Sequence, residues 1–230
     1  MSGFTCTCLA YFGLLSSLSR SDGITSPSNT SSAWPFWTAV TQVEQGQADW
    51  VFYGDSIPSD RLNELSTKYA KQVHIDPQPA TYYFAFNTTI PPFDNLKARQ
   101  AVNFATDRNA LIKLYGGPKL ASPTCQVLPP DFPGYKPYCP YTAGSDTTKW
   151  TGVDLTKAKQ LVQQSGTSGM KVVVNSASDD TSKALAQQMV SDLDKIGYKA
   201  TTQLLTGSIQ YPYVQNSNNS SKWNVAWSAW

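Results

Sequence analysis

The residues 82–95 constrain the fold more than any other part of this chain. Residues 82–86 read "YYFAF", a continuous aromatic and apolar run that is typical of a strand covered on both faces. The Pro-Pro pair at 91–92 cannot donate to a β-ladder, so the strand must end before it. Asp94 or Asn95 then offers an oxygen that can cap a helix. We therefore predict a buried strand, a rigid turn and a capped helix.

The predicted helix continues through residues 96–115, with Leu96 and Val102 among its inward positions, and Gly116 begins its stop signal. Arg99 and the Asp107–Arg108 pair are expected on a solvated or salt-bridged face of this helix. Before this region, the pattern predicts a helix near residues 37–45, a strand at 49–53 and a short helix from Asp60. A further helix is expected from Asp154 to Gly166.

The residues 171–205 form a compact strand–helix–strand candidate. The β-branched run at 171–174 predicts one strand, and Asp180 or Thr181 can cap the helix that follows. The chain then returns as a strand at 198–205. Such a unit implies parallel pairing with a right-handed connection. One more strand is expected at 223–227, so the chain is read as an α/β protein.

Composition excludes several classes of function. The chain has 230 residues, of which 40% are hydrophobic and 15% charged, and a formal net charge of +2. This charge is too small, and too evenly spread, to indicate a nucleic-acid partner. No uninterrupted apolar segment approaches the length that crosses a bilayer. The low charge and the 15 prolines fit a secreted, loop-rich protein.

The cysteines form two unlike pairs. Cys125 and Cys139 flank a proline-rich segment, and a disulfide between them would close a loop of about 15 residues and stabilise by roughly 3 kcal/mol. Two unrelated free thiols are the open alternative. Cys6 and Cys8 are too close to bridge each other comfortably, and their role is not assigned. Neither pair has zinc-ligand spacing, so no metal site is predicted.

The first 33 residues match no known signal. The apolar run from 9 to 18 lacks preceding basic residues and a following cleavage site, so no export signal is evident. Residues 19–32 are rich in Ser, Thr and Asn, a composition typical of disorder. We expect residues 1–33 to be a disordered or non-native leader.

The sequence argues against catalysis. A Ser-His-Asp or Cys-His arrangement needs a histidine, and the chain has only His74, in a strand-like context that favours a hydrogen-bonded structural role. The phosphate-binding glycine motifs are absent from the sequence. We therefore expect no enzyme activity, no catalytic residue and no cofactor.

Aromatic residues gather near the end of the chain. Alternation along the predicted strand puts Trp223 and Trp227 on one face, so at least one of them is expected in the core. Large aromatics also line ligand pockets, because they give contact area at low entropic cost. Periodicity favours a core position for each, and leaves a ligand contact open.

From about residue 46 to 230 the chain resembles the family 5 solute-binding proteins, the peptide- and nickel-binding subunits of ABC importers. The resemblance rests on seven motifs in the family's order: "GQADWVF", "YYFAFNT", "PPFDN", "RQAVNFATDR", "LPP" with "PGY", "KAKQLVQQSG" and the strand–helix–strand unit before the final tryptophan. It implies an incomplete two-lobed, class II periplasmic-binding-protein-like fold, mostly the second lobe. The expected divisions are a leader at 1–33, a first-lobe remnant at 34–81 and an incomplete ligand-closing lobe at 82–230.

The resemblance also implies functional positions. The strand at Tyr82 and Tyr83 is where the chain of such proteins crosses into the closing lobe. By alignment of "WNVAWSAW", Trp230 corresponds to the ligand-contacting tryptophan of the family's W-x-x-D-Y pattern, and Trp227 is the second candidate. The aspartate of that pattern does not follow here. We therefore expect a chain truncated at both ends, which binds solute weakly or not at all.

The resemblance implies an extracytoplasmic binding protein, in the periplasm or on the outer face of the cell membrane. Its expected partners are an oligopeptide or another small solute and an ABC permease, and a monomer is expected. Nickel chelates, sugars and opines stay open as solutes. The alternative is a secreted carbohydrate-binding module, in which Trp223, Trp227 and Trp230 would form a stacking platform.

Overall fold

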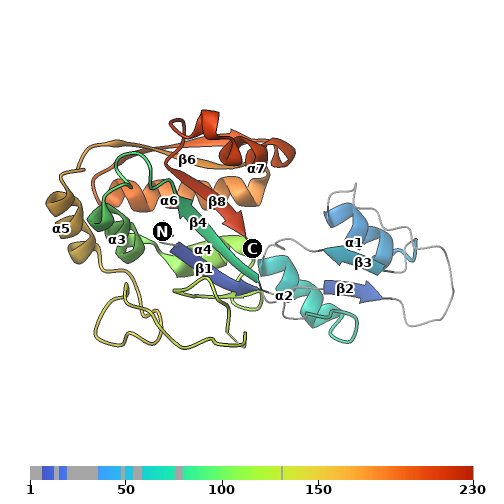
Figure 1. Cartoon of the computed structure of the whole chain (residues 1–230). Coiled ribbons are helices and arrows are strands. Elements are labelled where there is room, and N and C mark those ends of the chain that lie inside the picture. The colour runs from blue at the N-terminus through green and yellow to red at the C-terminus, as the bar shows by residue number, and fades with distance from the viewer. Residues whose placement is uncertain are drawn as a thin grey trace.

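The computed structural model describes residues 7–12, 16–19, 36–47, 50–53, 59–75, 80–130 and 132–229. Figure 1 shows a large unit and, beside it, a small unit. The large unit is built on a six-stranded sheet and the small unit contains a two-stranded sheet. The order of the large sheet is β5-β1-β4-β8-β6-β7. In that order the strands are Ala121–Ser122, Thr7–Phe12, Ala80–Phe86, Val225–Ala229, Lys171–Ala177 and Lys199–Leu205.

The directions of these strands follow from their connections. β6 and β7 pair in parallel with α6 (Asp180–Lys195) between them in the chain, which confirms the predicted strand–helix–strand unit. β8 is also parallel to β6, whereas β4 is antiparallel to β8 and to β1. β4 thus lies inside the sheet, between β1 and β8, in agreement with its continuous aromatic sequence.

The leader differs from its expectation over the described residues. β1 lies at 7–12 and pairs antiparallel with β4, so it covers an edge of β4 that would otherwise have unpaired backbone groups. β2 (Ser16–Ser19) pairs antiparallel with β3 (Trp50–Tyr53). The division expected between residues 81 and 82 falls inside β4, which belongs wholly to the large sheet.

Four helices of the large unit form a layer on one side of its sheet, namely α3 (Leu96–Ala105), α4 (Arg108–Tyr115), α5 (Leu155–Ser165) and α6 (Asp180–Lys195). Of these, α4 and α6 pack against the strands, whereas α3 packs against α6 and α5 packs against α3. The opposite face carries α7 (Gly207–Gln215), which is followed by the short 3-10 helix η1 (Ser217–Asn219). No helix was predicted at α7, which carries Pro212 inside it, and proline is disfavoured in a helix interior.

The single helix predicted for residues 96–115 is two helices. α3 ends at Ala105, and the Asp107 side chain accepts a hydrogen bond from the backbone N–H of Ala110 to begin α4. An aspartate that can cap favours such a break, because it satisfies an orphan donor of a new helix. Leu96, expected inward, is exposed at the start of α3.

Two of the predicted helix caps are confirmed, and a third is shifted. Asn95 caps α3, and Asp154 caps α5, which ends at Gly166 in the left-handed conformation with φ of 70°. Asp179 caps α6, one or two residues before the predicted cap. Each cap fixes the point where a helix leaves its loop, so these side chains help to set how the helices lie on the sheet.

The core lies between the sheet and α3, α4 and α6. Phe84 and Phe86 on β4 point into it, and the ring of Phe93 lies 4.8 Å from that of Phe86. Val172 and Val174 on β6 line the same side. The inward residues of α6 are fully buried, namely Leu185, Ala186, Met189 and Leu193. This burial of apolar surface is the main force that holds the two layers together.

The small unit contains α1 (Phe36–Glu44), β2, β3 and α2 (Ser59–Lys68). Val40 on α1 and Leu62 and Leu65 on α2 are buried. The strand-like context expected around His74 is not found, since Val73 forms only a single bridge and His74 is exposed outside any strand.

Candidate functional site

The order of the parallel strands creates a switch point between β6 and β8. From β6 the chain passes through α6 to β7 on one side, and from β7 it returns through α7 to β8 on the other side of β6. In open α/β sheets, ligands bind outside the carboxyl ends of the strands at such a point. We call the carboxyl ends of β6, β7 and β8, at Ala177, Leu205 and Ala229, the carboxyl edge.

The carboxyl edge lies on the side of the large sheet where the small unit is found. In Figure 1, β8 ends near the label C, beside α2, and β4 begins close to the same place. Both ends come together because β4 and β8 are antiparallel, with Tyr82 opposite Ala229 and Phe86 opposite Val225. A solute at the carboxyl edge would therefore lie next to the small unit.

The two tyrosines predicted at the lobe crossing lie on opposite faces of β4. Tyr82 lies on the helix-covered face, with its ring 4.9 Å from that of Tyr115 on α4. Tyr83 lies on the other face, directly opposite Ser228 of β8, and both are half-exposed. Tyr83 and Ser228 therefore offer an aromatic ring and two hydroxyl groups beside the carboxyl edge.

Trp227 lies in the core. Its side chain is 8% exposed, and its ring lies 5.0 Å from that of Phe84 and 5.8 Å from that of Tyr82. Val225 shares this face, as alternation predicts, and Trp223 precedes the strand. Of the two roles left open for Trp227, its packing favours the core role. Trp230 lies outside the described residues.

A chain of polar side chains joins β6, β7 and α7 behind the carboxyl edge. The side-chain amide of Gln210 on α7 donates to Asn175 Oδ1 on β6 at 3.2 Å and to the carbonyl oxygen of Trp227 on β8 at 3.1 Å. Asn175 donates to Gln203 Oε1 on β7 at 3.1 Å, and Gln203 donates to the hydroxyl of Tyr213 at 3.1 Å. Asn175 and Gln210 are buried.

Sequence reasoning missed this amide chain. The signal was Asn175 itself, a polar residue inside the β-branched strand "KVVVNSA". A polar side chain in a strand covered on both faces needs a partner, since an unpaired buried amide costs free energy. The sequence did not indicate which residue would be the partner of Asn175, because α7 was not predicted.

The cysteine pair cross-links the long segment between α4 and α5. The structure records a disulfide between Cys125 and Cys139, whose Cα atoms are 5.0 Å apart. Beside it, the buried hydroxyl of Thr81 donates to the carbonyl of Val127 at 2.8 Å. The cross-linked segment is thereby attached to the first residues of β4, next to the carboxyl edge.

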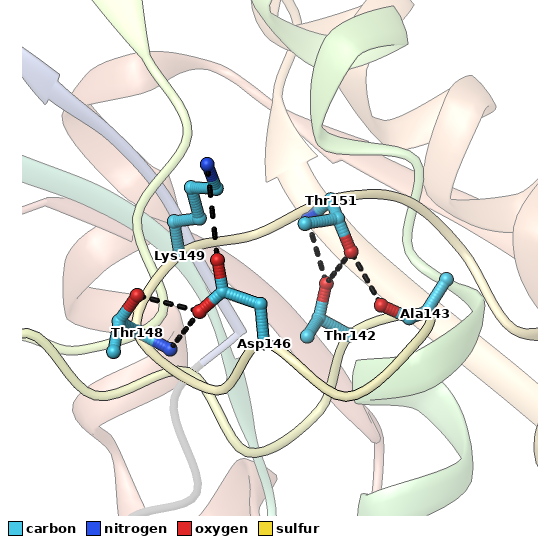
Figure 2. A network of polar contacts seen from close by, with 6 residues as sticks. All are labelled: Thr142, Ala143, Asp146, Thr148, Lys149 and Thr151. Carbon is cyan, nitrogen blue, oxygen red and sulfur yellow. Dashed lines mark hydrogen bonds and ion pairs between the residues drawn. The ribbon is translucent and has the colours of Figure 1, made fainter.

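Local hydrogen bonds order the rest of this segment. Figure 2 shows Asp146 accepting from both the hydroxyl and the backbone N–H of Thr148, with Lys149 at 3.7 Å on the other carboxylate oxygen. The hydrogen bonds from Thr148, ahead of the charge of Lys149, hold the pKa of Asp146 below its usual value. Thr151 bonds to Thr142 and to the carbonyl of Ala143 in the same view.

A buried carboxylate lies away from the carboxyl edge. Asp192 on α6 accepts from the backbone N–H of Asp107 at 3.0 Å, from Gln188 at 2.9 Å and from Lys195 at 2.9 Å. Burial raises the pKa of Asp192 above its ordinary value, although these bonds act in the opposite direction. This group joins α6 to the start of α4, which is a structural role.

The described residues offer neither a metal site nor a membrane-spanning helix. Their His, Cys, Asp and Glu side chains form no group of three or more that could hold a metal ion. Among the helices in the ranges given above, none combines the length and the apolar character that crossing a membrane requires.

The sequence profile of a family described as "Bacterial extracellular solute-binding proteins, family 5 Middle" matches residues 35–230. The glutathione-binding protein GsiB of Escherichia coli (strain K12) is 28% identical over 169 residues, covering 71% of this chain and 30% of that protein. The protein of the same name from Salmonella typhi is 28% identical over 166 residues, with the same shares. The chain thus spans about 30% of the length of the curated relatives it matches.

Solved structures share the fold. The murein tripeptide binding protein MppA of Escherichia coli superposes with a TM-score of 0.66 at 21% identity, covering 84% of this chain and 36% of that one. The ABC transporter substrate binding protein CtaP of Listeria monocytogenes gives 0.67 at 21% identity, covering 85% and 38%. These matches confirm the predicted α/β, periplasmic-binding-protein-like architecture over part of that fold.

Proposed function

Because the chain belongs to family 5 of the bacterial extracellular solute-binding proteins, we propose that it captures a small solute outside the cytoplasm for delivery to an ABC permease. The solute is an oligopeptide or a peptide-like molecule, since the relatives are named for glutathione and for murein tripeptide. The protein acts as a monomer and carries out no chemistry on the solute.

One observation of the structure supports this proposal above the others. The carboxyl edge lies at a switch point of the sheet, on the side of the small unit, and switch points are where open α/β sheets bind their ligands. Two units that face one another across such an edge can enclose a solute and exclude water from it.

Tyr83 and Ser228 have side chains that suit a peptide-like solute. The ring of Tyr83 gives contact area at low entropic cost, and both hydroxyls can donate to or accept from peptide groups. They lie opposite each other on the face that the core helices leave free. Trp230 follows β8 in the chain, and its assignment as a ligand contact stays part of this proposal.

The carbohydrate-binding alternative loses its main support. A stacking platform needs exposed indole rings, but Trp227 is buried against Phe84 and Tyr82. Trp223 is half-buried, and its indole nitrogen is inaccessible to solvent.

Calorimetric titration tests the proposal. The 230-residue chain is titrated with glutathione and with a mixed oligopeptide library, and saturable binding of a peptide-like probe is the expected result. No saturable heat with any probe up to about 1 mM would contradict solute binding itself.

A pair of variants localises the site. Tyr83→Ala should weaken binding on the order of tenfold, as expected for loss of a contacting tyrosine. Tyr211→Ala is the control, since Tyr211 is an exposed tyrosine on α7. Equal losses in the two variants would contradict the placement of the solute beside Tyr83.

A further inference from the structure

The end of β8 is paired unequally on its two sides. On the β4 side, pairing continues to Ala229, which lies opposite Tyr82. On the β6 side, the pairs in the described residues are Val174 with Val225 and Asn175 with Ala226. β6 itself continues to Ala177 in partnership with β7. The last residues of β8 therefore leave β6 where the sheet meets the carboxyl edge.

Gln210 bridges the two strands where their ladder stops. Its Nε2 atom donates to the carbonyl of Trp227, one position beyond the last β8 residue that pairs with β6. The same atom donates to Asn175 Oδ1, on the last β6 residue that pairs with β8. The Gln210 side chain is 2% exposed, so water does not compete for these bonds.

We propose that Gln210 is a positioning residue, whose side-chain amide replaces the missing β6–β8 ladder and so fixes the carboxyl end of β8. The residue after Trp227 is Ser228, which faces Tyr83. The part of this inference that concerns ligand rests on the proposed function: a fixed β8 end holds Ser228 in the place where the solute is bound.

The chemistry at this position is specific to an amide of this length. Nε2 supplies two N–H donors, and both of its partners are carbonyl-type oxygens that need a donor. A carboxylate at the same place would turn an acceptor toward these oxygens. A methionine keeps the volume and length of the side chain but supplies no donor.

The chain offers a matched control within the same network. Gln203 accepts from Asn175 on β6 and donates to Tyr213 on α7, and neither of these bonds involves β8. Gln203→Met therefore removes an amide from the network and leaves the Gln210–Trp227 bond intact. Comparing the Gln203→Met and Gln210→Met variants separates the effect of Gln210 on the end of β8 from the effect of losing any amide of the network.

Hydrogen exchange of the whole 230-residue chain tests directly whether Gln210 fixes the carboxyl end of β8. In Gln210→Met, we expect the amides of residues 225–229 to exchange about fivefold faster, the factor that loss of one net hydrogen bond gives. In Gln203→Met, the same amides should stay within about twofold of the wild type. Unchanged exchange in Gln210→Met, or an equal acceleration in both variants, would overturn the inference.

A third variant adds a readout that a merely structural role does not predict. In Gln210→Glu, the ionised carboxylate has no proton for the Trp227 carbonyl, whereas the protonated form donates one. Burial raises the pKa of such a carboxyl. Protection of residues 225–229, corrected for intrinsic exchange rates, should therefore recover as the pH falls to about 5. Protection that stays low at this pH would count against the donor role.

Titration with glutathione and the mixed oligopeptide library then tests the link to the ligand. If the wild type binds, Gln210→Met should bind about fivefold more weakly and Gln203→Met within about twofold of the wild type. Unchanged affinity in a variant with faster β8 exchange would overturn the positioning role. If the wild type binds no probe, the proposed function is contradicted. The hydrogen-exchange result then decides by itself whether Gln210 fixes the end of β8.

Discussion

At the scale of single residues, Asp192 connects two helices through one buried carboxylate. Its side chain is 1% exposed and gives the backbone N–H of Asp107, at the start of α4, an acceptor that α4 itself does not supply. The side chain of Lys195, which is partly exposed on α6, forms an ion pair with the carboxylate of Asp192. The carboxylate is retained although burial opposes its ionisation, because the groups around it all donate to it.

Removing this acceptor should destabilise the protein. We expect Asp192→Ala to lower the free energy of unfolding by about 1–3 kcal/mol, since it leaves the N–H of Asp107 without its partner. Asp94→Ala removes an exposed carboxylate and should change this free energy by less than about 0.5 kcal/mol. Denaturant unfolding at neutral pH measures both, and equal effects would contradict the buried role of Asp192.

The raised pKa of Asp192 gives a pH prediction. The folded protein holds this proton more tightly than the unfolded chain, so the contribution of Asp192 to stability is full below the ordinary value of 3.8 and is lost as pH rises through the higher folded pKa. The stability of the wild type relative to Asp192→Asn should therefore grow as the pH falls from about 7 to about 4. A constant difference would contradict a raised pKa.

Trp227 and Tyr83 provide a second test at this scale. Trp227 is buried between Phe84 and Tyr82, so Trp227→Ala should cost about 3–5 kcal/mol of unfolding free energy. Tyr83 is half-exposed, and Tyr83→Ala should cost about 1 kcal/mol. Denaturant unfolding again measures the two values. A larger cost at Tyr83 would contradict the assignment of the faces of β4.

Arg108 marks a limit of residue-level prediction. An arginine beside a capping aspartate indicates a solvated surface, yet Arg108 is 1% exposed and donates to the carbonyls of Thr124 and Asn103. Its guanidinium also lies 5.6 Å from the centre of the Trp150 ring. These partners come from the last turn of α3 and from the segment beyond α4, and local sequence does not indicate that they meet.

At the scale of elements, the strand–helix–strand unit and β4 were predictable because each one carries its own signal. β-branched and aromatic runs mark the strands, and Asn95, Asp154 and Gly166 mark helix ends with local hydrogen bonds or a left-handed turn. α7 carries no such signal. Its N-cap Thr206 makes no side-chain bond, and the helix is held by Gln210, whose partners are distant in sequence.

The disulfide-linked segment is the element most open to a chemical test. Non-reducing peptide mapping of secreted protein should find Cys125 joined to Cys139, and free thiols at both positions would contradict the bridge. Reduction should lower the free energy of unfolding by about 3 kcal/mol, the chain-entropy value for a loop of this length. It should also speed exchange near Thr81, whose hydroxyl bonds to Val127 in the segment.

At the scale of the whole molecule, two units meet along the line on which β4 begins and β8 ends. The large unit supplies a switch point, an open face with Tyr83 and Ser228, and the amide chain that supports β8. Its fold is shared with known substrate-binding proteins over part of their length. The sequence motifs indicated this architecture, but the support for the carboxyl edge became visible only through contacts between distant strands and α7.

The most direct test of the central claim is hydrogen exchange of the 230-residue chain with and without a saturating peptide-like probe. If solute binds at the carboxyl edge, exchange should slow in residues 177–180, 205–208 and 225–229, and in the first residues of β4. Protection confined to the outer surfaces of α3 and α5, or no protection at a probe concentration that saturates the calorimetric signal, would contradict the account.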